Sequence, residues 1–321
     1  MVFGLMLMIL VLSLGKAYDK GELVYGVTFS VKQARHLELD WQAAYRAILD
    51  DLGARRLRLS AYWDEVEPRS GEYVWDDLDW QVNEAATRGA SVILAAGGRL
   101  PRWPECHFPD WAAALPKEQR EAELLDYLQA TVLRYRNAAN IIAWQVENEP
   151  FLNQFGECPN LDPAFLDKEI ALVKSLDSRP VIITDSGELS VWIPAAKRAD
   201  VFGTTMYRDT YSRFLKSYIH YPISPAFFRF KQRLTGWFAE PEDWIVIELA
   251  AEPWGPNSYK EMTREEKDRT MSLAKFKEIV EFSRQAGFRT FYFWGAEWWY
   301  WEKLQNDQPA YWDYAKTLFG K

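Results

Sequence analysis

Two glutamates in the middle of the chain stand where carboxylates could do acid-base chemistry. Glu147 and Glu149 lie in the stretch Trp144–Phe151, WQVENEPF, which follows the apolar run NIIAW and contains Pro150. A carboxylate at the end of a buried strand must be paired, hydrogen-bonded or used, because burying a free charge is costly. Whether either acid does chemistry depends on the elements that position it.

Apolar strand-like runs alternate with helix-like segments from residue 21 onward, without a linker rich in Pro, Ser or Gly. Such alternation is typical of βαβ units and of α/β folds. The eight expected strands are, in chain order, Leu23–Phe29, Arg55–Ser60, Ser91–Ala96, Ile141–Val146, Pro180–Thr184, Val201–Tyr207, Trp244–Glu248 and Thr290–Trp294. Eight strands predict a single (β/α)8 TIM barrel. A doubly wound sheet is disfavoured, because neither GxGxxG nor GxxxxGK(S/T) occurs.

The expected helix ends agree with this assignment. Asp40 is predicted to cap the helix that precedes the second strand, and Gly53 to end it in the left-handed conformation. The junctions GARRLRL, GASVIL and GFRTFYF place Gly53, Gly89 and Gly287 at three such helix-to-strand turns. This repetition of one structural unit favours the barrel.

The N-terminal segment differs from the rest of the chain. Its first fourteen residues, MVFGLMLMILVLSL, are almost wholly apolar and have the length of a signal-peptide core, too short to span a bilayer comfortably. We expect residues 1–20 to be a signal peptide or a membrane anchor and residues 21–321 to form the barrel. The protein would then be secreted or membrane-anchored and extracytoplasmic, with a membrane as partner only through this segment.

Charge and composition narrow the other partners. Lys and Arg number 38 against 46 Asp and Glu, which gives a net charge of −8. No basic cluster is long enough to follow a phosphate backbone, so nucleic acid is not an expected partner. Trp is unusually frequent, with 16 residues, and its flat ring suits stacking on a ligand in a cleft. The sequence leaves the oligomeric state open.

The chain has two cysteines, Cys106 and Cys158. They fall in the loops after the third and fourth expected strands, which are neighbours in a barrel. We expect them to approach disulfide distance, with Cα atoms no more than about 7 Å apart. A disulfide would suit an exported protein.

Active sites of barrels lie at the carboxyl ends of the strands, so the last residues of each strand are the candidates. These candidates are Arg58 and Ser60 on the second strand, Asn148 and Glu149 after the fourth, Tyr207 on the sixth, Glu248 on the seventh and Trp294 on the eighth. Two carboxylates, an arginine, an amide, a phenol and an indole would then meet in one pocket. Glycoside hydrolysis needs such a set, with one acid to protonate the leaving oxygen and one carboxylate to attack the sugar carbon.

The expected positions divide the two acid roles. Arg58 points into the barrel and needs a buried acid partner, for which Glu248 is the candidate. An arginine beside Glu248 would hold it ionised as the nucleophile, whereas Glu149, less compensated, would keep a raised pKa and carry the proton. No metal or cofactor is needed, and a zinc site is not expected from three His without metal-ligand spacing.

At these residues the chain resembles the clan A glycoside hydrolases, TIM-barrel enzymes whose two catalytic glutamates close strands four and seven. NEP at 148–150 matches their strand-four motif, and WQVENEP is similar to the WQ-x-D-N-E form of family 42 β-galactosidases. The segment Arg56–Trp80 is similar to the strand-two region of families 5 and 42. The resemblance covers residues 24–318. It departs after Glu248, which LAAEPW follows, and at Thr205, where family 5 often has His.

The resemblance implies a role for each residue at a matching position. Glu149 would be the acid/base and Glu248 the nucleophile of a retaining glycoside hydrolase that cleaves β-linked glycosidic bonds. Asn148 would hydrogen-bond the 2-hydroxyl of the sugar, Tyr207 would hydrogen-bond the nucleophile, and Trp294 would line the subsite at the cleaved bond. The substrate would be an oligo- or polysaccharide, and the identity of its sugar stays open.

Aromatic residues in the loops are further candidates for substrate contact. Trp103, in the loop after the third strand, and Trp254, after the seventh, are expected to bind sugar by stacking. His107 is a weaker candidate for the same contact. The insertion 208–243 after the sixth strand is apolar and aromatic, and we expect it to fold over the barrel mouth or to meet a membrane or partner. Other loop tryptophans either line subsites or pack loops; they are Trp111, Trp298, Trp299 and Trp301.

Alternatives remain for the acids and for the function. Glu252 is a rival of Glu248, but a loop fixes a side chain less well than a strand end does, so we expect Glu252 to contact substrate or brace its loop. Glu147, one layer deeper in the barrel, is expected to support Arg56 or Arg58. A transglycosylase would use the same catalytic residues. A carbohydrate-binding barrel without catalysis would tolerate the loss of either catalytic glutamate.

Overall fold

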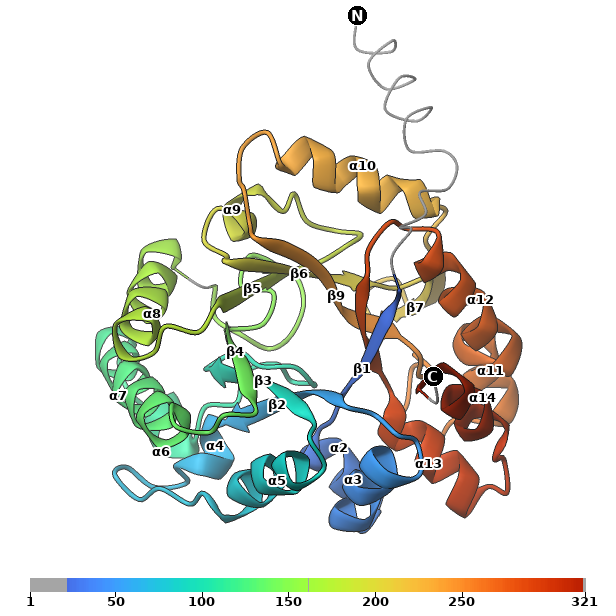
Figure 1. Ribbon diagram of the computed structural model, residues 1–321, viewed down its shortest axis with the longest axis horizontal. Helices are drawn as coiled ribbons and strands as arrows, with labels where there is room; N and C mark the ends of the chain where they lie inside the picture. The colour runs from blue at the N-terminus through green and yellow to red at the C-terminus, as the bar shows by residue number, and fades with distance from the viewer. Residues whose placement is uncertain (1–21, 161, 320–321) are drawn as a thin grey trace, which may run out of the picture.

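Eight parallel strands close into a barrel at the centre of the computed structural model, which describes residues 22–160 and 162–319 (Figure 1). The strands are β1 (Val24–Thr28), β2 (Arg56–Tyr62), β3 (Ser91–Gly97), β4 (Ile141–Val146), β5 (Val181–Asp185), β6 (Val201–Met206), β9 (Asp243–Ala250) and β10 (Thr290–Trp294). Their order around the barrel is β1-β10-β9-β6-β5-β4-β3-β2. The expected strands and the (β/α)8 TIM barrel are therefore confirmed, and the predicted N-terminal segment 1–20 lies outside the described residues.

Helices surround the barrel and connect its strands (Figure 1). In chain order they are α2 (Val31–His36), α3 (Trp41–Asp50), α4 (Trp63–Val66), α5 (Asp76–Thr87), α6 (Asp110–Ala113), α7 (Lys117–Tyr135), α8 (Pro163–Leu176), α9 (Ile193–Ala196), α10 (Pro225–Thr235), α11 (Arg264–Met271), α12 (Leu273–Arg284), α13 (Ala296–Gln305) and α14 (Ala310–Phe319). None of these described helices is long and apolar enough to cross a membrane.

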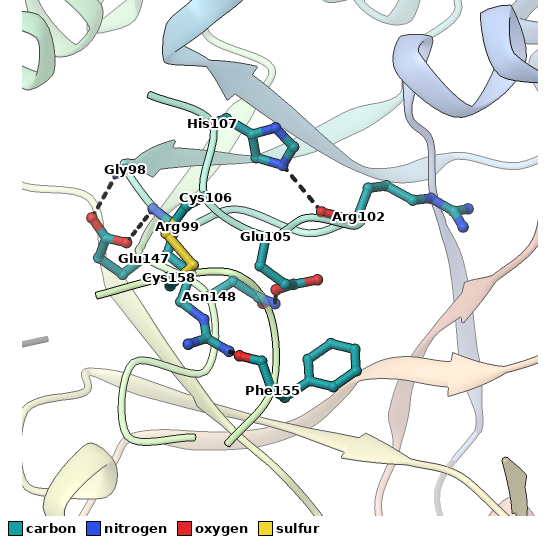
Figure 2. The surroundings of a disulfide bond; sticks show 10 residues. All are labelled: Gly98, Arg99, Arg102, Glu105, Cys106, His107, Glu147, Asn148, Phe155 and Cys158. Atoms are coloured by element: carbon teal, nitrogen blue, oxygen red, sulfur yellow. Dashed lines mark hydrogen bonds between the residues drawn. A yellow bond between two sulfur atoms is a disulfide. The ribbon is translucent and has the colours of Figure 1, made fainter. Parts of the chain in front are cut away.

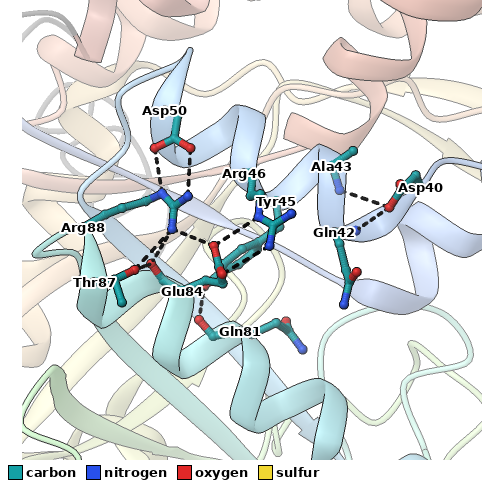
Figure 3. A network of polar contacts seen from close by, with 10 residues as sticks. All are labelled: Asp40, Gln42, Ala43, Tyr45, Arg46, Asp50, Gln81, Glu84, Thr87 and Arg88. Atoms are coloured by element: carbon teal, nitrogen blue, oxygen red, sulfur yellow. Dashed lines mark hydrogen bonds and ion pairs between the residues drawn. The ribbon is translucent and has the colours of Figure 1, made fainter.

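The helix ends follow from capping chemistry. The Asp40 carboxylate accepts hydrogen bonds from the backbone N–H groups two and three residues later, so it caps α3 as expected (Figure 3). Gly53, Gly89 and Gly287 have φ of 82°, 64° and 82°, at the turns that lead from α3, α5 and α12 into the next strand. A residue with a Cβ atom is strained in this conformation, so glycine is favoured at all three turns.

Helices α3 and α5 are joined by ion pairs on the surface (Figure 3). Arg46 on α3 pairs with Glu84 on α5 at 3.2 Å, and Arg88 pairs with both Asp50 and Glu84 at 2.6 Å. Surface pairs of this kind contribute only about 0–1 kcal/mol each. They orient two helices whose packing depends mainly on the apolar residues beneath them.

The floor of the barrel is apolar. Its cluster is formed by buried side chains from five strands, namely Ile93, Ala143, Ile182, Ile245, Ile247 and Tyr292. Side chains alternate along a strand, so the other set packs outward against the helices and forms the larger core. The polar side chains of the candidate site lie nearer the carboxyl ends of the strands.

An irregularity in β9 decides where Glu248 points. In the pairing of β9 with β6, the register shifts by one residue between Val246 and Glu248. In the pairing of β9 with β10, it shifts by one residue between Val246 and Leu249. Ile245 and Ile247 both belong to the cluster inside the barrel, so strict alternation would turn Glu248 outward. The extra residue turns Glu248 inward instead, which is a use that β-bulges have next to active sites.

The insertion after β6 forms a hairpin and then a helix. Strand β7 (Asp209–Ser212) pairs antiparallel with β8 (Ser217–His220), and α10 follows. In the hairpin turn, the Arg213 guanidinium lies 4.4 Å from the ring centroid of Trp103, which belongs to the loop after β3. The insertion therefore reaches over the mouth, as one of the two expectations had it, and its Phe214 side chain is 93% exposed.

Close packing at the start of β1 gives a stability prediction. A Cβ atom added at Gly26 would lie 2.6 Å from the Tyr292 ring and 2.8 Å from the Arg56 carbonyl oxygen. Because a backbone atom cannot move aside without a large cost in free energy, we expect Gly26→Ala to lower the free energy of unfolding by about 1–3 kcal/mol. The control Gly236→Ala meets its nearest atoms at 3.3 Å and should change stability by less than about 0.5 kcal/mol. Urea unfolding measures both, and equal effects would contradict the packing argument.

Candidate active site

The guanidinium of Arg58 is the centre of the polar network at the barrel mouth. It is fully buried and donates hydrogen bonds to Gln145 Oε1 at 2.8 Å, Glu248 Oε1 at 2.7 Å and Asn148 Oδ1 at 2.8 Å. The expected contact of Arg58 with Glu248 is therefore confirmed. These contacts fix the carboxyl group of Glu248 and orient the amide of Asn148.

The second oxygen of Glu248 is also held. The Tyr207 hydroxyl donates to Glu248 Oε2 at 2.9 Å, so the expected position of Tyr207 beside Glu248 is confirmed. Burial raises the pKa of Tyr207 well above its usual value, and the charges of Glu248 and Glu149 raise it further. The phenol consequently stays a hydrogen-bond donor, and Glu248 is fixed through both of its oxygens.

Glu149 lies in a different environment from Glu248. It follows β4 with φ of 42°, and its N–H donates to Thr184 Oγ1 at 2.8 Å. Within the described residues its carboxyl group has no hydrogen-bond partner, although the residue is only 6% exposed. Burial raises the pKa of Glu149 well above its usual range, and the nearby Glu248 and Glu105 raise it further. The two glutamates thus differ as expected, one held by donors and one disposed to keep its proton.

Glu147 does not support Arg56 or Arg58, so that prediction was wrong. Its carboxylate accepts hydrogen bonds from the backbone N–H groups of Gly98 and Arg99 at 2.7 and 2.6 Å (Figure 2). The expectation assumed that β4 continues in regular alternation, but the strand ends at residue 146 and Glu147 has φ of 58°. The left-handed backbone turns Glu147 away from the barrel interior, onto the start of the loop after β3.

A second buried acid lies next to Glu147. Glu169, on α8, is fully buried, and burial followed by the charge of Glu147 raises its pKa well above the usual range. Burial likewise raises the pKa of Glu147, while Glu169 and the two N–H donors lower it. Because two ionised carboxyl groups repel each other in a buried site, we infer that Glu169 keeps its proton while Glu147 is the anion that receives the N–H groups.

Asn148 connects Arg58 to an acid that the sequence did not reveal. The Asn148 Nδ2 donates to Glu105 Oε2 at 3.0 Å (Figure 2). Glu105 is 4% exposed, and burial raises its pKa to about 7, with Arg99 lowering it and Glu248 raising it. A lone Glu in a loop carries no pattern, and its left-handed φ of 75° is visible only in the structure.

A disulfide joins the two loops that carry these acids. Cys106 and Cys158 are bonded, with a Cα separation of 5.3 Å, so the expected pairing is confirmed (Figure 2). Arg99 adds a second connection, because its Nη2 donates to the Phe155 carbonyl oxygen at 2.9 Å. The loops after β3 and β4 are consequently bound to each other beside Glu105.

Aromatic rings from several loops form a row near the two glutamates. The ring centroid of Trp103 lies 6.0 Å from that of Phe155, which lies 5.9 Å from Trp254, which lies 5.5 Å from Tyr207. Trp103 is 45% exposed and so offers a surface on which a sugar ring can stack. Trp103 and Trp254 thus lie together, as stacking on one substrate requires, and their role in binding stays a prediction.

Glu252 and Trp294 belong to one buried cluster. Arg102 stacks on Trp294, with 3.9 Å from its guanidinium carbon to the ring centroid, and pairs with Glu252 and Glu297. The Tyr259 hydroxyl also donates to Glu252, at 2.6 Å. Glu252 therefore braces its loop, which is one of the two roles expected for this residue. Trp294 lies at the strand end as expected, with Arg102 over one face.

Other candidates from the loops serve packing. His107 Nε2 donates to the Arg102 carbonyl oxygen at 3.1 Å, and its Nδ1 accepts from Lys32 at 3.0 Å. Burial and the charge of Lys32 lower the pKa of His107 to about 3, so the ring is neutral and both nitrogens are occupied. Three tryptophans of α13 are buried in the hydrophobic core; they are Trp298, Trp299 and Trp301.

The acids of the site are not arranged around a cation. Across residues 22–160 and 162–319, no group of three or more His, Cys, Asp or Glu side chains has a geometry that could hold a metal ion.

Comparison with known proteins identifies the fold. No family model and no curated protein matches the sequence. The exo-β-1,4-mannosidase Op5Man5 from Opitutaceae bacterium strain TAV5 is similar over 87% of this chain and 54% of its own, with a TM-score of 0.58 and 14% identity. The β-galactosidase from the psychrophilic Marinomonas ef1 is similar over 85% and 54%, with a TM-score of 0.57 and 14% identity.

A third similar structure is closer in length to this chain. Xylanase 10B from Thermotoga petrophila RKU-1 is similar over 85% of this chain and 82% of its own, with a TM-score of 0.55 and 15% identity. This chain spans about half the length of the mannosidase and the β-galactosidase, 54% in both cases. The three similarities confirm the fold that the sequence resemblance implied, a (β/α)8 TIM barrel.

The raised pKa values of Glu147 and Glu169 predict a pH dependence of stability. A carboxyl group with a raised folded pKa takes up a proton on folding, so its stabilising effect is full below about pH 4.5 and is lost as the pH rises towards the folded pKa. The loss is up to about 1.4 kcal/mol per pH unit for each proton. Glu169→Gln removes one such acid, so the free energy of unfolding should fall less steeply as the pH rises above about pH 5.

Urea unfolding at several pH values measures this slope. The control Glu118→Gln changes an exposed glutamate on α7 and should leave the slope as it is in the wild type. A slope that Glu169→Gln does not change would contradict a proton held by Glu169.

Proposed function

We propose that the chain is a retaining glycoside hydrolase that cleaves β-linked glycosidic bonds in oligo- or polysaccharides. The observation that carries this proposal is the difference between two buried acids at the carboxyl ends of β4 and β9. Glu248 is held by Arg58 and Tyr207, as a nucleophilic carboxylate needs to be. Glu149 has a raised pKa, as a general acid needs to have.

In the first step, Glu248 attacks the anomeric carbon and forms a glycosyl ester. The bond from that carbon to the leaving oxygen breaks, and Glu149 transfers its proton to this oxygen. In the second step, Glu149 removes a proton from water as the water oxygen attacks the same carbon. The ester bond to Glu248 then breaks, and both acids return to their starting states.

Other residues of the site would bind the sugar. Asn148 has its Oδ1 fixed by Arg58, which leaves an N–H for the 2-hydroxyl of the sugar at the cleaved bond. Trp294 would line this subsite, and the exposed Trp103 with Trp254 would stack on neighbouring sugars. The similar structures are named as a β-1,4-mannosidase, a β-galactosidase and a xylanase, which supports a β-glycoside as the substrate class.

Substitution of each acid tests its role. Screening with 4-nitrophenyl β-glycosides of mono- and disaccharides, and with polysaccharides, first identifies a substrate. We expect Glu149→Gln to lower the rate on a natural glycoside by roughly 10²- to 10⁴-fold, because the leaving oxygen loses its proton donor. With a dinitrophenyl leaving group, which needs no proton, Glu149→Gln should slow the first step much less. Glu248→Gln should abolish turnover on both kinds of substrate, because no nucleophile remains.

The matched control for these variants is Glu157→Gln, an exposed glutamate in the same loop as Glu149. It should retain wild-type rates on every substrate. If Glu149→Gln and Glu248→Gln also retain them, these two acids are not the catalysts and the proposed mechanism is refuted. Comparing product distributions with and without an added sugar acceptor separates hydrolysis from transglycosylation.

The stereochemistry of the product tests the double displacement. Two displacements at one carbon restore its configuration, so the first product should be the β-anomer. Proton NMR of the anomeric signal, recorded before mutarotation, measures it. An α-anomer as the first product would exclude Glu248 as the nucleophile of a covalent intermediate.

We also propose that the protein works outside the cytoplasm, secreted or held by its N-terminal segment. The bond between Cys106 and Cys158 supports this, because structural disulfides persist in oxidising compartments.

A further inference from the structure

One buried carboxyl group at the site has no part in the proposed mechanism. Glu105 lies in the loop after β3, is 4% exposed and accepts one hydrogen bond, from Asn148 Nδ2 to its Oε2 at 3.0 Å. Its other oxygen has no hydrogen-bond partner within the described residues, and Figure 2 shows it pointing away from Asn148. A carboxyl oxygen that can accept a hydrogen bond therefore remains available beside the amide that is proposed to bind the sugar.

The surrounding chain holds Glu105 in an unusual conformation. Its φ is 75°, which costs a residue with a Cβ atom roughly 1–2 kcal/mol. The disulfide at Cys106 restrains the next residue, and a Cβ atom at Gly156 would lie 2.8 Å from the Glu105 Cβ. Two loops thus fix this side chain against Asn148. Glycine or asparagine would take this backbone conformation with less strain, so the glutamate side chain itself is what the position retains.

The hydrogen bonds of Asn148 define what the pair can recognise. Its Oδ1 accepts from Arg58 and from Gln145, at 2.8 and 3.2 Å, so Nδ2 is the group that faces Glu105. An amide nitrogen carries two hydrogens, and Glu105 takes one of them. The second N–H of Asn148 and the second oxygen of Glu105 therefore both remain available at this hydrogen-bonded pair.

We infer that Glu105 binds substrate and, together with Asn148, selects a sugar with a free hydroxyl at C2. This inference rests on the proposed function, in which Asn148 contacts that position. A hydroxyl can accept from Asn148 and donate to Glu105 at the same time, so it satisfies both groups. An ammonium cannot accept, and a hydrogen or fluorine cannot donate. Each of these leaves one buried partner unsatisfied, which strongly disfavours binding. The substrate class is therefore neutral glycosides that are unsubstituted at C2.

Glu105 has a simpler alternative role, which is only to hold Asn148 in place. Glu105→Gln separates the two roles, because its carbonyl oxygen can still accept from Asn148. Its NH2 group would then stand where Glu105 had an acceptor. A residue that only positions Asn148 would work as well with Gln as with Glu, whereas a residue that reads the hydroxyl would not.

The experiment compares the 4-nitrophenyl β-glycoside that the full chain hydrolyses fastest with its 2-deoxy counterpart. The measured quantity is the ratio of kcat/KM for the two substrates, so intrinsic differences in their reactivity cancel between protein variants. We expect Glu105→Gln to lower the preference for the 2-hydroxyl by about 10-fold to 100-fold relative to wild type. Rates on the 2-deoxy substrate should be nearly unchanged.

The outcomes separate this inference from the proposed function. If the chain hydrolyses β-glycosides and Glu105→Gln keeps the wild-type preference, the selection by Glu105 is refuted and the hydrolase stands. If the 2-amino-2-deoxy glycoside is hydrolysed as fast as the 2-hydroxy one, the selection is refuted as well. If no β-glycoside is hydrolysed, the proposed function and this inference fail together.

Two further variants guard against a folding artefact. Glu105→Ala removes the support of Asn148 and should lower kcat/KM on both substrates, unlike the selective effect of Glu105→Gln. Glu157→Gln, exposed and next to Cys158, should leave the preference at its wild-type value. Thermal unfolding of each variant, compared with wild type, shows whether a change in rate reflects a change in stability.

Discussion

The buried charge of Arg58 is the constraint on which the site depends. An unpaired guanidinium inside the barrel would cost several kcal/mol, so its partners must meet it in good geometry. Those partners are Gln145 on β4, Asn148 just after β4, and Glu248 on β9. Each must arrive at the right height, and Glu248 does so only because of the bulge in β9. The register of three strands is thereby coupled to one side chain.

The loop after β4 shows how adjacent acids come to different tasks. Glu147 and Glu149 both have left-handed backbone conformations, which cost free energy and persist only where surrounding contacts enforce them. Glu147 turns outward, where two backbone N–H groups and Glu169 receive it, and so fixes the start of the loop after β3. Glu149 turns towards Glu248 and keeps its carboxyl group free of protein partners. Glu147 therefore has a structural role, whereas the carboxyl group of Glu149 remains available for chemistry.

Local pattern and barrel order were enough to predict much of this structure. Alternating apolar runs located the strands, and their order brought Arg58 to Glu248 and Cys106 to Cys158. The wrong prediction for Glu147 and the missed role of Glu105 have a common physical cause. The side-chain positions of both residues depend on left-handed backbone conformations, which their residue types do not indicate. The bulge in β9 was equally invisible, because strand periodicity assumes that no residue is added.

Acids outnumber their cationic partners around the site, and this imbalance has consequences for both stability and chemistry. Arg58 is committed to Glu248, and Arg102 to Glu252 and Glu297, so Glu149 is left without a direct cation. Buried carboxyl groups in this situation keep a proton, and each lowers the stability of the fold near neutral pH. A barrel designed only to fold would replace them with apolar residues. Their retention is understandable if a protonated and an ionised carboxyl group must coexist at the same mouth, which is the condition for acid catalysis beside a nucleophile.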